Sequence, residues 1–377
     1  MSLRPLLARL EDASVEEIPL RARDGWELGL CRVTRGDTAK PAVLLLHGLT
    51  ASSDMFVLPE TRNLVEVLLD AGFEPWLLDW RGSCRLPYNE YGPEYSLDDV
   101  ALHDLPAAVA EVRRQIGKRD IFVVAHCVGA LALSLSMTAG LVPGLAGVIA
   151  QGVFLTPKMA LGSRLRMTLA EAVRPWIKEI PVDFRKVGLW SKHTPLFALA
   201  SIGADCPDPT CQMVHNSAWA SGATLFVHDN VSTRTHDRLA DLVGTCPMWI
   251  LPHLRKMELA RSVVAWNEGD LRYELLPPNA LLAADAISCP VLLLSGSENQ
   301  LWYDSNKLCA EVLRKRSPRL QVDYVEVPGY GHFDMFIGRA AALDVFPRIV
   351  KWLQRSVPAG TARAESVALP TQMLREG

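Results

Sequence analysis

The residues best suited to chemistry lie in the segment A-H-C-V-G, residues 125–129, between an apolar stretch and a helical one. Two small residues, Ala125 and Gly129, stand two positions before and two positions after Cys127. A strand that turns abruptly into a helix strains its turn residue and leaves no room for bulk on either side. The spacing therefore predicts that the turn presents the Cys127 sulfur at the edge of a sheet. The N-terminus of the following helix favours the thiolate, which is the nucleophilic form of cysteine.

The elements that position this turn alternate along the chain. Short strands that are apolar throughout predict an α/β fold, with a mostly parallel, twisted sheet covered by helices on both faces. A hairpin that turns at Asp24-Gly25 comes first. We then expect strands at 41–47, 74–80, 121–126, 145–153, 289–297 and 320–328, and helices at 61–71, 97–116, 129–139, 304–316 and 341–355.

The alternation stops near Thr156 and resumes only at residue 289. We therefore predict a core made of residues 1–155 and 286–357. The intervening residues 156–285 are rich in Trp, Met, Pro and His and lack a strong strand pattern, which predicts a mainly helical lid over the carboxyl edge of the sheet. Residues 358–377 have no periodicity, and we expect a flexible tail there.

The motifs resemble those of the α/β-hydrolase superfamily, with a cysteine in place of the usual serine. The stretches L-L-L-H-G-L-T-A-S-S-D-M-F-V (44–57) and W-L-L-D-W-R-G-S (76–83) resemble the acid-lipase branch. The elbow H-C-V-G and the stretch G-Y-G-H-F-D-M-F-I-G (329–338) are more similar to the hydrolase-like domain of cholesterol-oxidase-type proteins. The elbow also resembles that of polyhydroxyalkanoate synthases. No G-x-G-x-x-G is present, so the resemblance implies neither a flavin nor any other cofactor.

The resemblance implies roles for several further residues. His332 follows the last predicted strand in a glycine loop, where the family places its catalytic base. The backbone N–H groups of Leu49 and Val128 correspond to the donors of the oxyanion hole. His47 is expected to shape the oxyanion loop, and the side chain of His126 to point away from the nucleophile.

The third member of the triad departs from the family pattern. The family's carboxylate follows the strand of residues 289–297, and in S-G-S-E-N-Q that place falls on Asn299, with Glu298 beside it. A thiolate–imidazolium pair needs orientation more than a negative charge, so Asn299 is consistent with Cys127 as nucleophile. Glu298 is the alternative, and Asp304 or Asp334 are further substitutes.

These residues predict a cysteine-dependent acyl-transfer enzyme. Cys127 would form an acyl-thioester from a hydrophobic ester or thioester, such as one carried on coenzyme A or a carrier protein, and pass the acyl group to an amine, alcohol or thiol. Hydrolysis of an ester, lactone or thioester at the same Cys-His site is the alternative. A non-catalytic lipid- or sterol-binding module is the alternative from another class.

Composition excludes other classes of protein. The 39 basic and 42 acidic residues give a net charge of −3, without the basic excess of a nucleic-acid-binding protein. The longest apolar stretch is interrupted by Pro143 and by glycines, so no transmembrane segment is expected. The N-terminal residues do not resemble a signal peptide, which predicts a cytoplasmic protein.

The 8 cysteines are too few for a disulfide scaffold in a chain of 377 residues. Cys206, Cys211 and His215 have a loosely plausible zinc-ligand spacing, but they lack a C-x-x-C knuckle and an obvious fourth ligand. We therefore expect no bound metal, and instead a local disulfide or two packed thiols.

Overall fold

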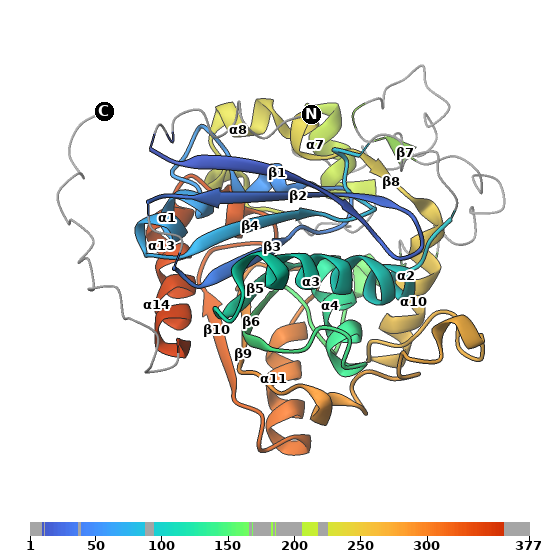
Figure 1. Ribbon diagram of the computed structural model, residues 1–377. Coiled ribbons are helices and arrows are strands. Elements are labelled where there is room, and N and C mark those ends of the chain that lie inside the picture. Colours follow the sequence, from blue (N-terminus) through green and yellow to red (C-terminus); the bar gives the residue numbers. More distant parts are fainter. Residues whose placement is uncertain are drawn as a thin grey trace.

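The computed structural model of the chain describes residues 10, 12–36, 39–86, 94–165, 168, 182–183, 185, 206–217 and 225–357. Its centre is an 8-stranded sheet with the strand order β1-β2-β4-β3-β5-β6-β9-β10 (Figure 1). The strands are β1 (Ser14–Arg21), β2 (Glu27–Thr34), β3 (Ala42–Leu46), β4 (Glu74–Asp79), β5 (Ile121–His126), β6 (Leu145–Gln151), β9 (Val291–Gly296) and β10 (Val322–Val327). β2 pairs antiparallel with β1 and β4, and all other pairs in this sheet are parallel. The predicted fold class is confirmed.

Helices cover both faces of the sheet, which explains why the central strands are apolar throughout. All residues of β3, β4, β5 and β9 are buried. Figure 1 shows α1, α13 and α14 on one side and α3, α4 and α11 on the other. The bounds of these helices are Leu64–Asp70, Ala341–Asp344, Phe346–Ser356, Leu105–Ile116, Val128–Thr138 and Ser305–Arg316. The helix predicted at 341–355 is thus two helices, with Pro347 in the first turn of the second.

Helix α4 is buried along its whole length, from Val128 to Thr138. Its first turn lies very close to the end of β3, since a Cβ added to Gly129 would be only 2.5 Å from the backbone oxygen of His47. Bulk at position 129 is therefore excluded, as the spacing around Cys127 predicted. This contact fixes the direction of the chain immediately after the cysteine.

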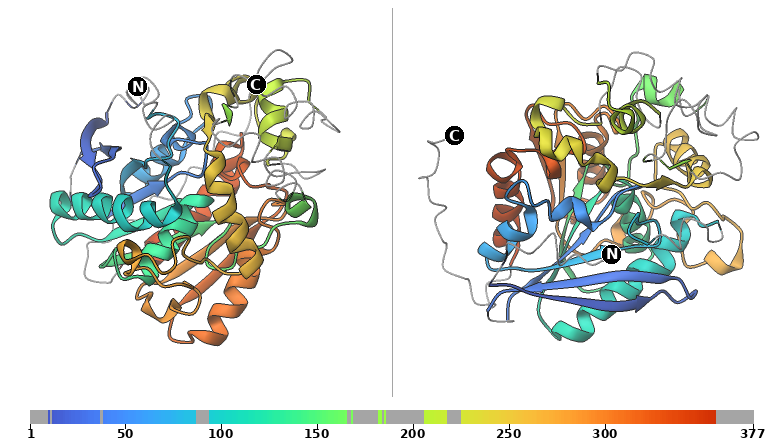
Figure 2. Two further views of the ribbon diagram at one scale, coloured as in Figure 1. Left: turned by 90° about the vertical axis from the view of Figure 1, so that its right-hand side faces the viewer. Right: turned by 90° about the horizontal axis from the view of Figure 1, so that it is seen from above.

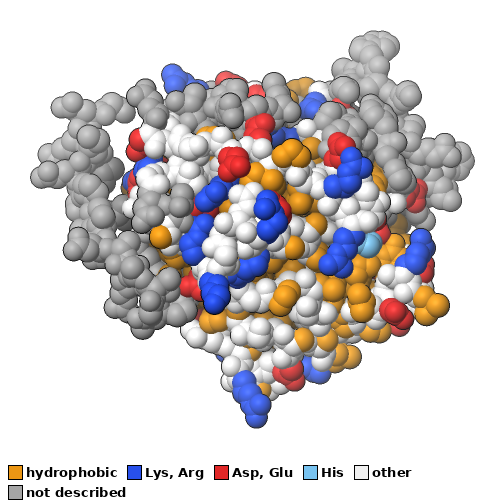
Figure 3. All heavy atoms as spheres, viewed as in Figure 1, with side chains coloured by type: hydrophobic (Ala, Val, Ile, Leu, Met, Phe, Trp, Pro, Cys, Tyr) orange, Lys and Arg blue, Asp and Glu red, His pale blue; other side chains and the backbone are white. Residues whose placement is uncertain are grey.

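The described part of residues 156–285 contains short helices and a small ribbon (Figures 1 and 2). The helices are α7 (Pro209–Gln212), α8 (Thr233–Asp237), α9 (Leu239–Leu242) and α10 (Leu251–Ala260), and the ribbon pairs β7 (Val182–Asp183) with β8 (Thr245–Cys246). Figure 3 shows hydrophobic atoms at its lower right, where the segment after α10 lies in Figure 1. Leu271, Leu275 and Leu282 of that segment are exposed. The predicted tail, 358–377, lies outside the described residues.

None of the described helices combines the length and the apolar character needed to cross a membrane. The cysteines are all free thiols, so the disulfide considered for Cys206 and Cys211 is not formed.

Candidate active site

Cys127 occupies a sharp turn between β5 and α4. Its backbone has φ 56° and ψ −127°, a conformation that is strained for any residue with a Cβ. The facing loop approaches closely, because a Cβ added to Gly48 would lie 2.9 Å from the Cβ of Cys127. Glycine is therefore required on the neighbouring loop as well as in the helix. The turn at Cys127 is therefore packed closely on both sides, against Gly48 of the facing loop and, through Gly129, against the end of β3.

Three N–H groups converge on the Cys127 sulfur. The backbone amides of Leu49 and Val128, predicted as oxyanion donors, both hydrogen-bond to it. The indole Nε1 of Trp302 is a third donor, 3.5 Å from Sγ. Trp302 was not expected from the sequence, because it lies 175 positions away and comes to the site only through the fold.

The thiol of Cys127 is nevertheless protonated at neutral pH. Burial raises its pKa to about 11, although the three hydrogen bonds lower it. The side chain is only 8% exposed, so removal of water outweighs the favourable donors and the helix N-terminus. The expectation of a resting thiolate is therefore wrong.

His332 lies in the turn between β10 and α12 (Asp334–Ile337). One of its ring nitrogens is within 4.8 Å of the Cys127 sulfur, and its ring centroid is 4.5 Å from that of His126. Burial and the neighbouring His126 place the pKa of His332 well below 6.5, so the ring is neutral at pH 7. Neither ring nitrogen has a hydrogen-bond partner among the described residues. The predicted base is thus beside the predicted nucleophile and can accept a proton.

Asn299 is buried close to His332 but does not hydrogen-bond to it. A Cβ added to Gly152 would lie 2.7 Å from Nδ1 of His332 and 3.7 Å from Nδ2 of Asn299, so both groups border the same glycine. The Asn299 amide instead donates to Ser295 Oγ at 3.3 Å and accepts from the Trp302 backbone N–H at 3.2 Å. Its assignment as the third member of the triad stays a prediction.

The carboxylates considered as alternatives are all engaged elsewhere. Glu298 is exposed and accepts a hydrogen bond from Ser297. Asp304 forms an ion pair with Lys158 at 3.6 Å. Asp334 is buried, where it accepts from Asn230 and from the Gly331 backbone N–H. Among the described residues, no carboxylate orients His332.

Gln151, at the end of β6, connects the two histidines. Its Nε2 donates to the backbone oxygen of His332 at 3.1 Å, and its Oε1 contacts Nδ1 of His126. A ring nitrogen of His126 is within 4.8 Å of the Cys127 sulfur, so the expectation that this side chain points away from the nucleophile is wrong. Burial lowers the pKa of His126 to about 4. Gln151 was not expected from the sequence, although a polar side chain at the carboxyl end of an apolar strand beside the elbow was a usable signal.

The oxyanion loop is supported by a buried polar network. Asp79 accepts from the backbone N–H and the hydroxyl of Ser53, at 2.9 and 2.7 Å, and from Ser83 at 2.7 Å. Nδ1 of His47 is 2.8 Å from the backbone oxygen of Gly48, consistent with the expected role of His47 in shaping the loop. These contacts hold the Leu49 N–H in place before any substrate binds.

The cavity beside Cys127 is small and mostly apolar. Its volume is about 40 Å³, and its walls include Val214, Leu225 and Val243 from the insertion together with Leu301. This space holds roughly one or two water molecules and no substrate of ordinary size. The structure therefore represents a closed form, in which described residues of the insertion cover the nucleophile.

The sequence model of the alpha/beta hydrolase family matches residues 43–344, which include the oxyanion loop, the elbow and His332. The chain belongs to the alpha/beta hydrolase family. A second model, a partial alpha/beta-hydrolase lipase region, matches residues 6–60 of this hydrolase. The matched range thus contains the residues that the fold brings together around Cys127.

Lipases are among the relatives of this hydrolase. Lipase member K of Mus musculus is 23% identical over 354 residues, which cover 89% of this chain and 86% of that protein. Lipase member K of Homo sapiens is 34% identical over 128 residues, but these cover only 32% of that protein. A carboxyl esterase from Bacillus coagulans, solved with glycerol, has a TM-score of 0.59 at 11% identity and covers 92% of this chain and 99% of its own. The structural likeness shows the fold. The resemblance to cholesterol-oxidase-type proteins and to polyhydroxyalkanoate synthases stays a prediction.

Proposed function

We propose that this hydrolase cleaves hydrophobic carboxylic esters through an acyl-thioester on Cys127. The proposal is supported chiefly by the convergence of the Leu49 N–H, the Val128 N–H and the His332 ring on one sulfur atom. The relatives are named as lipases, which favours water over another acyl acceptor. Hydrolysis is therefore placed ahead of the acyl transfer that the thioester chemistry alone favours.

The neutral resting state dictates the order of proton transfers. As Sγ of Cys127 attacks the ester carbonyl carbon, its proton passes to His332. The carbonyl oxygen becomes an oxyanion and accepts hydrogen bonds from the N–H groups of Leu49 and Val128. The tetrahedral intermediate collapses by breaking the bond to the alcohol oxygen, which takes the proton from His332. An acyl-thioester and a neutral ring remain.

Water completes the cycle on the same residues. His332 removes a proton from water as the water oxygen attacks the thioester carbonyl carbon, and the same two amides hold the second oxyanion. The carbon–sulfur bond then breaks, and the sulfur of Cys127 takes back the proton from the ring. The products are a carboxylic acid and the original thiol. Hydrophobic acyl chains fit this scheme, because the cavity walls are mainly aliphatic.

Acyl transfer remains the second candidate, and the closed cavity favours it. Val214, Leu225 and Val243 cover the sulfur, so a bound acyl group can shield the thioester from water until an alcohol, amine or thiol enters. Under this alternative the acyl donor is an ester or a thioester on coenzyme A or a carrier protein. The two candidates differ only in what attacks the thioester.

The test is to incubate the protein with p-nitrophenyl esters of increasing chain length and follow intact mass and released acid. Hydrolysis predicts an acyl adduct on Cys127 that turns over in buffer alone, and no adduct in Cys127→Ala. Cys289→Ala, a buried cysteine remote from the site, is the control and should behave like the wild type. An adduct that persists until an amine or alcohol is added indicates transfer. No adduct from any ester or thioester, with the protein folded, indicates a non-catalytic binding module and refutes both candidates.

A further inference from the structure

We propose that Cys206, Cys211, His228 and His236 form a structural zinc site in the insertion. The donor atoms of these four residues all lie within 4.8 Å of one another. Cys206 precedes α7, Cys211 lies in α7, His228 precedes α8 and His236 lies in α8; both helices are at the top of the molecule in Figure 1. The site is independent of the proposed reaction, since none of its ligands belongs to the Cys127 site.

The distances agree with tetrahedral coordination. Sγ of Cys206 is 3.4 Å from Nε2 of His236, and Sγ of Cys211 is 3.2 Å from Nε2 of His228. Four ligands at the usual zinc–sulfur and zinc–nitrogen bond lengths are separated by roughly 3.3–3.8 Å. Two thiolates and two imidazoles are also the donor set that selects zinc among common divalent ions.

The local structure orients the two cysteines. Asp208 accepts a hydrogen bond from the Cys211 backbone N–H at 2.7 Å, which begins α7 and turns the chain between the cysteines. Gln212 donates to the backbone oxygen of Cys206 at 2.8 Å and holds that residue near the helix. The two thiols are in hydrogen-bond contact with each other, as the expectation of two packed thiols had it, and each sulfur also contacts a histidine nitrogen. Two sulfurs and two ring nitrogens thus face one common point, which suits metal binding.

His215, the histidine considered from the sequence, is outside this set. Its Nδ1 accepts a hydrogen bond from the Leu225 backbone N–H at 2.9 Å, and its ring stacks on His228 with centroids 4.7 Å apart. The spacing C-x4-C was a usable signal, but the two true partners follow at 17 and 25 positions after Cys211 in a segment without periodicity. The expectation that no metal binds is therefore replaced by this proposal.

The position of the cluster gives the metal a structural purpose. His228 follows Leu225, whose backbone oxygen accepts hydrogen bonds from the N–H groups of His332 and Phe333, each at 3.0 Å. Asn230 donates to Asp334 at 2.7 Å in the same turn. A metal bound to His228 therefore braces the segment against which the His332 turn rests.

The first measurement uses the wild-type protein, so it does not depend on a variant that folds. We expect about one zinc per chain by elemental analysis after dialysis, and cobalt replacement with the absorption bands of tetrahedral thiolate ligation. Cys206 and Cys211 should resist iodoacetamide until a chelator removes the metal. Absence of zinc before and after incubation with zinc salts, or a Cys206–Cys211 disulfide in the purified protein, would overturn the proposal.

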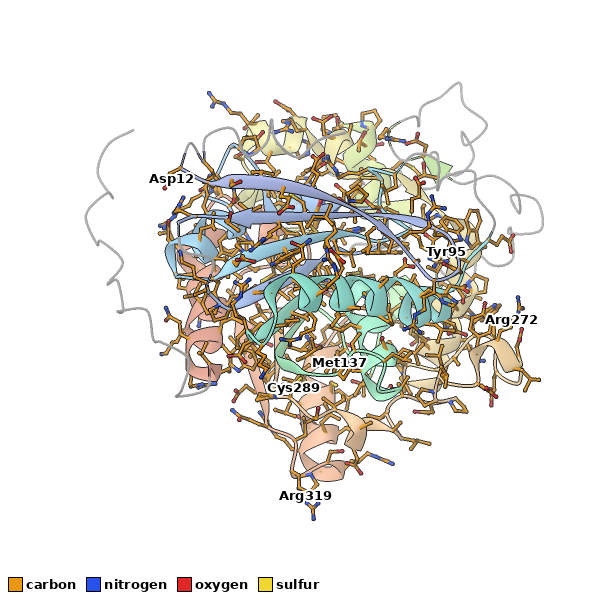
Figure 4. All side chains as sticks on the ribbon, in the orientation of Figure 1. Asp12, Tyr95, Met137, Arg272, Cys289 and Arg319 are labelled. Carbon is orange, nitrogen blue, oxygen red and sulfur yellow. The ribbon has the colours of Figure 1, made fainter. Side chains whose placement is uncertain are left out.

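Variants then locate the metal. Cys211→Ala and His236→Ala should lose zinc, whereas Cys289→Ala should keep it; Cys289 lies at the far end of the sheet from α7 (Figures 1 and 4). Cys127→Ala should also keep it, because His126, Cys127 and His332 are a second group of possible ligands. Full zinc content in Cys211→Ala, or its loss in Cys127→Ala alone, would place the metal elsewhere and refute the assignment.

Discussion

The chemistry of the Cys127 site depends on the competition between burial and hydrogen bonding at one sulfur. Three N–H donors and a helix N-terminus favour the thiolate, but burial outweighs them and leaves the pKa of the thiol at about 11. His332 beside it has a pKa well below 6.5 for the same reason. The pair is therefore a neutral thiol and a neutral base, as in serine hydrolases, and differs from the thiolate–imidazolium pair of other cysteine enzymes.

The first prediction concerns pH. A base with a lowered pKa can accept a proton at neutral pH, so kcat/KM should fall only when the pH drops well below 6.5 and His332 becomes protonated. A thiol with a raised pKa is protonated at neutral pH, so the rate of Cys127 alkylation by iodoacetamide should rise until about pH 11. Mass spectrometry of the modified peptide gives this rate. An alkylation midpoint below the ordinary cysteine pKa would show a resting thiolate and contradict the argument.

The second prediction concerns Asn299 and Glu298. Asn299 fixes the backbone of Trp302, whose indole donates to the Cys127 sulfur. A hydrogen bond between neutral groups contributes about 0.5–1.5 kcal/mol, so Asn299→Ala should lower kcat/KM roughly twofold to tenfold. Glu298→Ala is the matched control, and it should change kcat/KM by less than about twofold because this side chain is exposed.

The variant Asn299→Asp separates the two roles of this residue. If the side chain contacts His332 during the reaction, the new carboxylate should raise the pKa of His332 seen in the pH dependence of kcat/KM. If it acts only through Trp302, that pKa should stay unchanged. Loss of activity in Glu298→Ala with little change in Asn299→Ala would make Glu298 the third member of the triad.

At the scale of elements, the alternation of apolar strands and helices was sufficient to predict the sheet and the elbow. Cys127 stands at the junction of a predicted strand and a predicted helix, and the resemblance to the α/β-hydrolase family implied that His332 and the N–H groups of Leu49 and Val128 lie beside it. The structure differs from the predicted elements where a helix contacts side chains that are distant in the sequence. The predicted helix at 97–116 contains a π-helical segment, η3 (Val100–Asp104), whose last residue binds the buried Arg81 through its carboxylate.

The third prediction tests the end of β6 as a support for His332. Gly152 has φ +88°, and an added Cβ would lie 2.5 Å from Cε1 and 2.7 Å from Nδ1 of the ring. Gly152→Ala should displace the ring, and a misplacement of about 1 Å costs on the order of a hundredfold in rate. The control is Gly140→Ala, which has φ +70° and nothing within 4 Å of the added atom. Both variants should lose about 1–2 kcal/mol of stability from backbone strain, measured by chemical denaturation.

Only Gly152→Ala should lose activity. Equal kcat/KM values for the two alanine variants would show that the ring has room to move, and that Gly152 serves the backbone turn alone.

At the scale of the whole molecule, described residues of the insertion lie over the sulfur. The boundaries of the insertion stay a prediction, which rests on the strand pattern that stops at Thr156 and returns at residue 289. The packing of the insertion on the core could not be predicted, because the segments that make these contacts are short and show little periodicity. The Gly244 backbone N–H, for example, donates to the backbone oxygen of Thr50 in the oxyanion loop at 2.8 Å.

The last prediction concerns release of this cover. Arg238, in the turn after α8, forms an ion pair with Glu60 of the core, and the two side chains are 30% and 10% exposed. A partly shielded pair contributes about 1 kcal/mol, so Arg238→Ala should favour opening and increase the labelling rate of Cys127 by a bulky maleimide roughly threefold to tenfold. Arg272→Ala is the control, because Arg272 points outward from the insertion (Figure 4) and contacts its sequence neighbours Asp270 and Tyr273. Unchanged labelling in Arg238→Ala, or an equal increase in Arg272→Ala, would show that this ion pair does not hold the closed form. A small maleimide tests the cause: if opening is the barrier, Arg238→Ala should accelerate its reaction less than that of the bulky reagent.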